Sequence, residues 1–105
     1  MGNKENYLAR LQLAIEHAHQ CRATWRYSEP VQEVFRGKTV WQGDVEVFDL
    51  GGHPEAKRCF AWSHNQGRDD KSERFVALLG IAPIESASTA VRVQIIKDVR
   101  SGYFK

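Results

Sequence analysis

The chain has 105 residues, which is enough for one domain and too short for two. Its hydrophobic share of 42% and charged share of 27% are typical of a globular protein, and an aromatic share of 10% argues against a disordered chain. Fifteen basic against thirteen acidic side chains give a net charge of +2, which is too small and too evenly mixed for a dedicated polyanion-binding protein.

A helix is expected at the start of the chain, over about residues 4–26. Apolar residues step by one, three or four positions and line one face of this helix: Tyr7, Leu8, Leu11, Ala14, Ile15, Ala18, Cys21 and Trp25. The cluster Ser28-Glu29-Pro30 ends the pattern. The following segment, 31–38, also has helical spacing but is too short to hold a helix alone, so it predicts one helical turn.

Two strands are expected next, over residues 39–50 and 56–64, because apolar and polar residues alternate in both. The turn sequence Gly51-Gly52-His53-Pro54 joins them, so the pair predicts a β-hairpin. This connection sets a register with three opposed pairs: Val45 with Phe60, Gly43 with Trp62, and Trp41 with His64.

A third strand over residues 74–81 and a final helix complete the predicted elements. The strand has apolar residues on both sides, so it needs cover on both faces, and Pro83 ends it. Ser86 or Ser88 can cap the helix, which places its apolar residues on one side: Ala87, Ala90, Val91, Ile95 and Val99.

The predicted order is α-β-β-β-α, which we interpret as a single α+β domain over residues 1–105. Short connections favour a three-stranded antiparallel sheet in two layers, with both helices on one face. Six apolar residues are expected on that face: Trp41, Val45, Phe60, Trp62, Phe75 and Leu79.

The opposite face of the predicted sheet is half apolar. It carries Phe48, Cys59, Ala61, Val76 and Leu78 among the polar residues Gln42, Asp44, Glu46 and Lys57. A contiguous apolar area is seldom left in water, so this face predicts a partner. We expect self-association as a homodimer, since two-fold pairs are the commonest oligomers. A different protein, a small molecule, or segment 31–38 folded over the face are the alternatives.

The cysteines and histidines do not predict a metal site or a cofactor. Cys21 and Cys59 lie in segments of different type, and we expect two free thiols. His17 and Cys21 have i, i+4 spacing on the first helix, but no second pair completes a four-ligand site. No secretory signal or membrane-length apolar run is evident, which favours a cytoplasmic protein without a membrane segment.

Asp44 and Glu46 are the first candidates for catalysis, because both point to the same side of the predicted strand. Paired carboxylates can divide the roles of acid and base when their environments differ. His53 could act as a base near Asp49. Polar residues at such a spacing are also typical of a solvated or interfacial face, and the turn alone explains His53. Cys59, expected opposite Glu46, is interpreted as a small buried apolar residue.

Three tryptophans could instead line a ligand pocket. Trp41 and Trp62 share a face in the predicted register, and Trp25 ends the helix expected to cover it. Such a pocket would take small apolar or cationic molecules, whereas the alternative is that the three rings fill a thin core.

Nucleic acid is not an expected partner. The α-β-β-β-α order is also that of the double-stranded RNA-binding domain, which carries basic residues at the start of its last helix. Here the matching stretch, 84–89, has one acid and no base.

The segment 40–99 resembles short uncharacterised bacterial proteins, including ones carried on mobile, integron-type gene cassettes. The residues that carry the resemblance are Gly43-Asp44-Val45-Glu46-Val47-Phe48-Asp49-Leu50, His53-Pro54-Glu55-Ala56-Lys57-Arg58 and Phe60-Ala61-Trp62. The resemblance implies a bacterial, cytosolic setting and brings no known activity. We therefore expect a small soluble binding or accessory protein that forms a homo-oligomer. The alternative is a small hydrolase-like enzyme using Asp44, Glu46 or His53 at or near the subunit interface.

Overall fold

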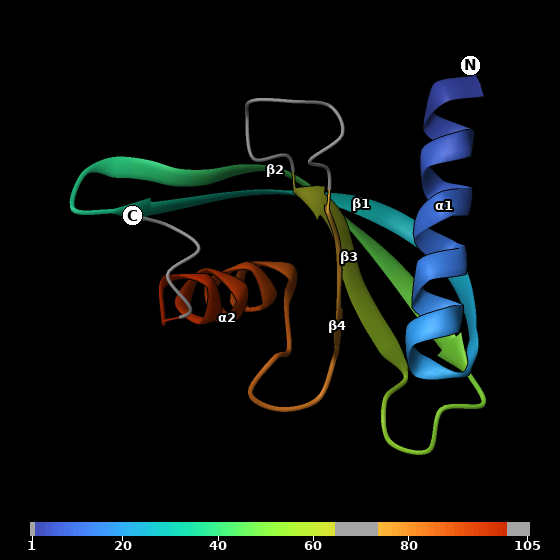
Figure 1. Ribbon diagram of the computed structural model, residues 1–105. Coiled ribbons are helices and arrows are strands. Elements are labelled where there is room, and N and C mark those ends of the chain that lie inside the picture. The colour runs from blue at the N-terminus through green and yellow to red at the C-terminus, as the bar shows by residue number, and fades with distance from the viewer. Residues whose placement is uncertain (1, 65–73, 101–105) are drawn as a thin grey trace.

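A four-stranded antiparallel sheet with one helix on each face forms the molecule in a computed structural model, which describes residues 2–64 and 74–100 (Figure 1). The α+β class with an antiparallel sheet and two helices is confirmed. The elements are α1 (Gly2–His19), β1 (Arg22–Phe35), β2 (Lys38–Gly51), β3 (Arg58–His64), β4 (Arg74–Leu79) and α2 (Ala87–Arg100). The strands lie in the order β1-β2-β3-β4, so each strand pairs with its neighbour in sequence.

The first helix ends at His19, and the prediction that it extends to about residue 26 is wrong. Gln20 adopts a left-handed conformation with φ of 56° and donates its N–H to the Glu16 carbonyl at 3.0 Å. The Glu16 carboxylate then accepts the N–H of Ala23 at 2.9 Å. These contacts satisfy polar groups at the helix end and turn the chain into β1.

Strand β1 replaces both the end of the predicted helix and the helical turn expected over 31–38, which makes four strands instead of three. It pairs with β2 from Arg22 opposite Gly51 to Phe35 opposite Lys38. A tight turn at Arg36 and Gly37 joins the strands, with φ of 54° and 78°. The hydrogen bonds to β2 stabilise this segment as a strand, whereas one isolated turn of helix has little stability of its own.

The hairpin of β2 and β3 exists, but its register differs from the prediction by two residues. Phe60 lies opposite Val47 and not opposite Val45. Gly51 still belongs to β2, and residues 52–57 make the connection. Because side chains alternate with a period of two, a slip of two residues leaves every residue of the pair on its predicted face.

The two helices lie on opposite faces of the sheet, so the prediction of both helices on one face is wrong (Figure 1). On the α2 side the buried core contains Val31, Val45, Val47, Phe60, Trp62, Val76, Ala87, Ala90 and Val91. On the α1 side it contains Leu11, Ile15, Ala23, Phe48, Cys59 and Ala61.

Strand β4 has the opposite orientation to the one predicted. Val76 and Leu78 pack toward α2, while Phe75 and Ala77 pack toward α1. Alternation could not choose between these orientations, because β4 is apolar on both sides.

The second face of the sheet is covered within the chain. Phe48, Cys59 and Ala61 are at most 1% exposed, and α1 packs on them. The half-apolar face that suggested a dimer interface is therefore not open at these residues, and segment 31–38 does not cover it either. No helix in the described residues is long and apolar enough to cross a membrane.

Strands β1 and β2 continue beyond the rest of the sheet as a two-stranded arm. The ladder between β2 and β3 runs only from Asp49 opposite Arg58 to Glu46 opposite Ala61. On the side of Glu46 toward the turn at Arg36 and Gly37, the arm passes over α2 (Figure 1). There the Glu33 carboxylate accepts a 2.7 Å hydrogen bond from Nε of Arg92. This separation of β2 from β3 creates the hollow described next.

Candidate binding site between strands β2 and β3

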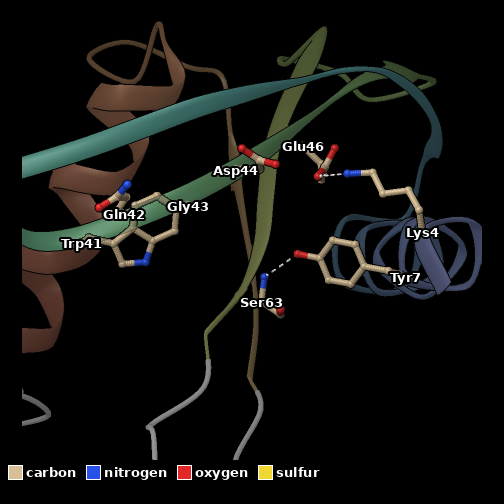
Figure 2. Close-up of a pocket in the computed structure, with 8 residues that line it drawn as sticks. All are labelled: Lys4, Tyr7, Trp41, Gln42, Gly43, Asp44, Glu46 and Ser63. Atoms are coloured by element: carbon tan, nitrogen blue, oxygen red, sulfur yellow. Dashed lines mark hydrogen bonds and ion pairs between the residues drawn. The ribbon is translucent and has the colours of Figure 1, made fainter.

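A hollow of about 420 Å³ opens where β2 leaves β3, beside the start of α1 (Figure 2). We call it the wedge. Strand β2 supplies most of its residues, α1 supplies two and β3 one: Trp41, Gln42, Gly43, Asp44 and Glu46, then Lys4 and Tyr7, then Ser63.

Tyr7 takes over a main-chain hydrogen bond that β2 would otherwise make. Its hydroxyl accepts the N–H of Ser63 at 3.0 Å (Figure 2). The register of β3 places Ser63 beyond Ala61, the last β3 residue paired with β2. An unpaired strand N–H needs an acceptor, so the Tyr7 hydroxyl stabilises the inner wall of the wedge.

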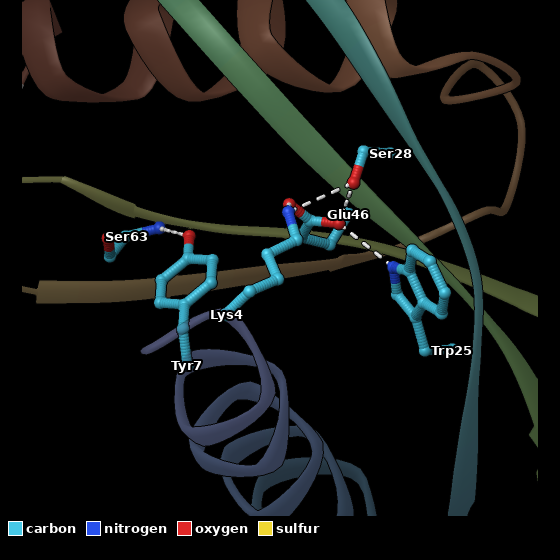
Figure 3. A network of polar contacts seen from close by, with 6 residues as sticks. All are labelled: Lys4, Tyr7, Trp25, Ser28, Glu46 and Ser63. Carbon is cyan, nitrogen blue, oxygen red and sulfur yellow. Dashed lines mark hydrogen bonds and ion pairs between the residues drawn. The ribbon is translucent and has the colours of Figure 1, made fainter. Parts of the chain in front are cut away.

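Glu46 is a buried carboxylate with a full set of donors (Figure 3). Nζ of Lys4 lies 2.8 Å from one carboxylate oxygen, and Nε1 of Trp25 donates to the other at 2.9 Å. The Ser28 hydroxyl donates to that second oxygen as well. A buried charge is tolerated when it is paired and hydrogen-bonded in this way. Glu46 therefore fixes α1 and β1 beside the wedge.

Asp44 differs from Glu46 although both carboxylates lie on the same side of β2. It is exposed, and the described part of the chain gives its carboxylate no ion pair. It lies opposite Pro30, which has no N–H to offer β2. Along an antiparallel strand, the N–H and C=O groups of successive residues point alternately to one side and to the other. Those of Asp44 point away from β1 and toward the wedge.

Trp41 forms the aromatic wall of the wedge and also covers Gly43. A Cβ on Gly43 would lie 3.1 Å from the Trp41 ring, so glycine allows the indole to lie against the backbone. The ring also meets Trp62 edge-on, with a centroid distance of 5.8 Å. The sequence set Gly43 opposite Trp62, but the indole that lies against Gly43 is that of Trp41.

The three tryptophans do not converge in one pocket. Trp41 and Trp62 are in contact, but Trp62 is 2% exposed and belongs to the core. Trp25 is 42% exposed and reaches the site through its bond to Glu46.

His53 does not join the two carboxylates. Its Nδ1 accepts the N–H groups of Glu55 and Ala56 at 3.1 and 2.9 Å, which organises the connection between β2 and β3. Its ring lies 6.4 Å from that of His19. The structure thus brings Asp44 and Glu46 together and uses His53 in the turn.

Both thiols are free, as predicted. Burial raises the pKa of the Cys59 thiol to about 12, and Cys21 adds a smaller electrostatic contribution. Cys21 lies beyond the end of α1, so the prediction that it shares a helix with His17 is wrong. Among residues 2–64 and 74–100, no group of three or more His, Cys, Asp or Glu side chains could hold a metal ion.

Sequence reasoning missed Lys4 and Ser63, and it assigned Tyr7 only to the helix core. Lys4 and Tyr7 are spaced i, i+3 and so lie on one side of α1, which was the available signal. The missing information was which sheet face α1 covers.

The chain matches no protein-family model, curated protein or solved structure in the comparisons made. The chemistry of the wedge is therefore argued from its own residues.

Proposed function

We propose that the protein binds small organic cations in the wedge. The observation that carries the proposal is the exposed Asp44 carboxylate, which shares a hollow with the rings of Trp41 and Tyr7. This fits the expectation of a small binding protein and specifies which of the candidate residues hold the ligand.

Charge supplies the first part of the recognition. Among the described residues, the charged lining groups are Lys4, Asp44 and Glu46, with a net charge of −1. Lys4 and Glu46 form an ion pair, so the remaining negative charge is that of Asp44. A ligand amine or quaternary ammonium placed beside Asp44 gains an electrostatic contact in a partly enclosed setting.

Aromatic rings supply the second part. Trp41 and Tyr7 lie on either side of the opening in Figure 2. A cation against such a ring gains about 0.5–2 kcal/mol, and tryptophan is the strongest partner. Compact cations with methyl groups on nitrogen suit this combination, because they bury apolar surface as well as charge.

Choline tests the proposal when it is compared with 3,3-dimethyl-1-butanol, which has the same shape and no charge. We expect choline to shift amide signals of β2 and Ser63 in a nuclear magnetic resonance titration, and the alcohol to bind at least about tenfold more weakly. Equal affinity for the two molecules would overturn the proposal.

Asp44→Asn should weaken choline binding by a similar factor, because the amide keeps the size and loses the charge. Glu55→Gln is the matched control, since Glu55 is an exposed acid outside the wedge. A loss of affinity that is the same in both variants would show that only net charge matters, and the assignment to Asp44 would fall.

Three expectations from the sequence stay as proposals beside this one. They are the bacterial, gene-cassette setting, self-association, and hydrolase-like activity through Asp44 or Glu46. The shared hollow supports the two carboxylates as a pair, whereas His53 is held in the turn.

A further inference from the structure

A second hollow, of about 720 Å³, lies at the other end of the sheet on the side that carries α2. Its lining residues come from the start of β3 and from residues 80–86, which connect β4 to α2. None of the residues described in the structure lines both this hollow and the wedge. Its volume lies within the usual range for small-molecule sites.

The charges of this hollow are opposite to those of the wedge. Of the described residues, Arg26, Lys57 and Arg58 line it together with two acids, Asp49 and Glu85, which gives a net charge of +1. Arg26 is bound to Asp49 at 2.9 Å, so that pair is neutral. The described part of the chain pairs neither Lys57 nor Arg58 with an acid, and both are exposed.

The floor of the hollow is apolar. Phe60 is buried there, and Leu50 and Ile84 are partly buried beside it. Gly80 closes one wall: its N–H donates to the Arg58 carbonyl at 2.8 Å, and a Cβ on Gly80 would lie 3.1 Å from that oxygen and 3.3 Å from the Phe60 ring. The main chain is thus held close to Arg58 and its neighbour in sequence, Lys57.

We propose that this second hollow binds organic anions that join a phosphate group to an aromatic body. The Arg58 guanidinium presents paired donors that match a phosphate, and Lys57 adds a second positive charge. The aromatic body would lie on Phe60, Leu50 and Ile84, so that one molecule satisfies both the charge and the apolar floor. The Glu85 carboxylate also lines the hollow and lowers its net positive charge.

Phenyl phosphate is the probe, with inorganic phosphate and phenol as the two halves tested separately. We expect phenyl phosphate to shift the amide signals of Arg58, Phe60 and Gly80 and to bind at least about tenfold more tightly than either half. Binding should weaken as salt is added. Equal affinity of phosphate and phenyl phosphate would reduce the site to surface ion pairing and overturn the proposal.

The double variant Lys57→Gln with Arg58→Gln should lose this binding by at least about tenfold. The control double variant, Arg36→Gln with Lys38→Gln, removes the same charge from the turn of the arm. It should still bind phenyl phosphate. An equal loss in the two double variants would contradict a specific site. Both pairs are exposed, and unchanged amide spectra away from the substitutions confirm the fold. Choline binding at the wedge is read in the same spectra, so each proposal can fail without the other.

Discussion

Asp44 and Glu46 lie two positions apart on β2 and have different tasks in the proposed site. Glu46 is 1% exposed and its two oxygens accept from Lys4, Trp25 and Ser28, so it holds α1 and β1 in place. Asp44 is exposed, and the described part of the chain gives it no ion pair, so it is the carboxylate that we propose for a ligand. Alternation along the strand predicted that the two carboxylates share a side, but it could not predict which one is buried. That difference depends on Lys4 and Trp25, which are distant in sequence.

Cys59 provides a prediction about pH from a single side chain. Burial raises the pKa of its thiol from 9.0 to about 12. Between these values the unfolded chain releases a proton that the folded protein retains, so the contribution of the thiol to stability is complete below pH 9 and is lost as the pH rises toward 12. We expect the free energy of unfolding to fall in this window by up to about 1.4 kcal/mol per pH unit from this group.

Urea denaturation of the Cys59→Ala variant isolates that contribution. The variant should be less stable than the parent at neutral pH, because it loses buried volume, but its stability should fall less steeply above pH 9. Parallel pH profiles of the two proteins would contradict a raised thiol pKa.

Among the helices and strands, β1 is the element that the local spacing of apolar residues failed to predict. Cys21 and Trp25 continue the apolar spacing of α1, and the chain nevertheless leaves the helix at Gln20. The strand is stabilised by its partner β2, which follows it in sequence, and helical spacing carries no information about that ladder. By contrast, the alternation in β2 and β3 correctly predicted which residues share a face of the sheet. A register shift of two residues leaves each side chain on the same face.

The turn between β1 and β2 gives a prediction about how these strands are joined. Gly37 has φ of 78°, and, apart from its two chain neighbours, no described residue has an atom within 4 Å of the position that a Cβ would take. Gly37→Ala should therefore cost only the strain of the left-handed backbone, about 1–2 kcal/mol. Gly51→Ala is the control, since its Cβ would make ordinary contact with Arg22 at 3.9 Å. Thermal unfolding measures both, and equal stability of Gly37→Ala and the parent would exclude this turn.

In the whole molecule, helices cover both faces of the sheet, which changes the surfaces available for self-association. The sequence showed that both sheet faces carry apolar residues, and it could not show that α1 covers one of them. Large apolar side chains remain exposed instead along the arm, at Val34, Phe35 and Val40. Any self-association must therefore use a surface other than the face under α1.

Light scattering tests the expected self-association. We predict the mass of a dimer, because the exposed apolar side chains of the arm favour association. A mass equal to one chain at high protein concentration would contradict it. The wedge proposal does not require a dimer, because one chain already supplies Asp44, Trp41 and Tyr7 to the hollow.

The most direct test of the wedge as a cation site is the measurement of nuclear Overhauser contacts between the methyl protons of choline and the protein. We predict contacts to the rings of Trp41 and Tyr7, and their loss in the Asp44→Asn variant. Contacts only to exposed apolar groups of the arm, such as Phe35, or contacts that persist unchanged in that variant, would contradict a cation site in the wedge.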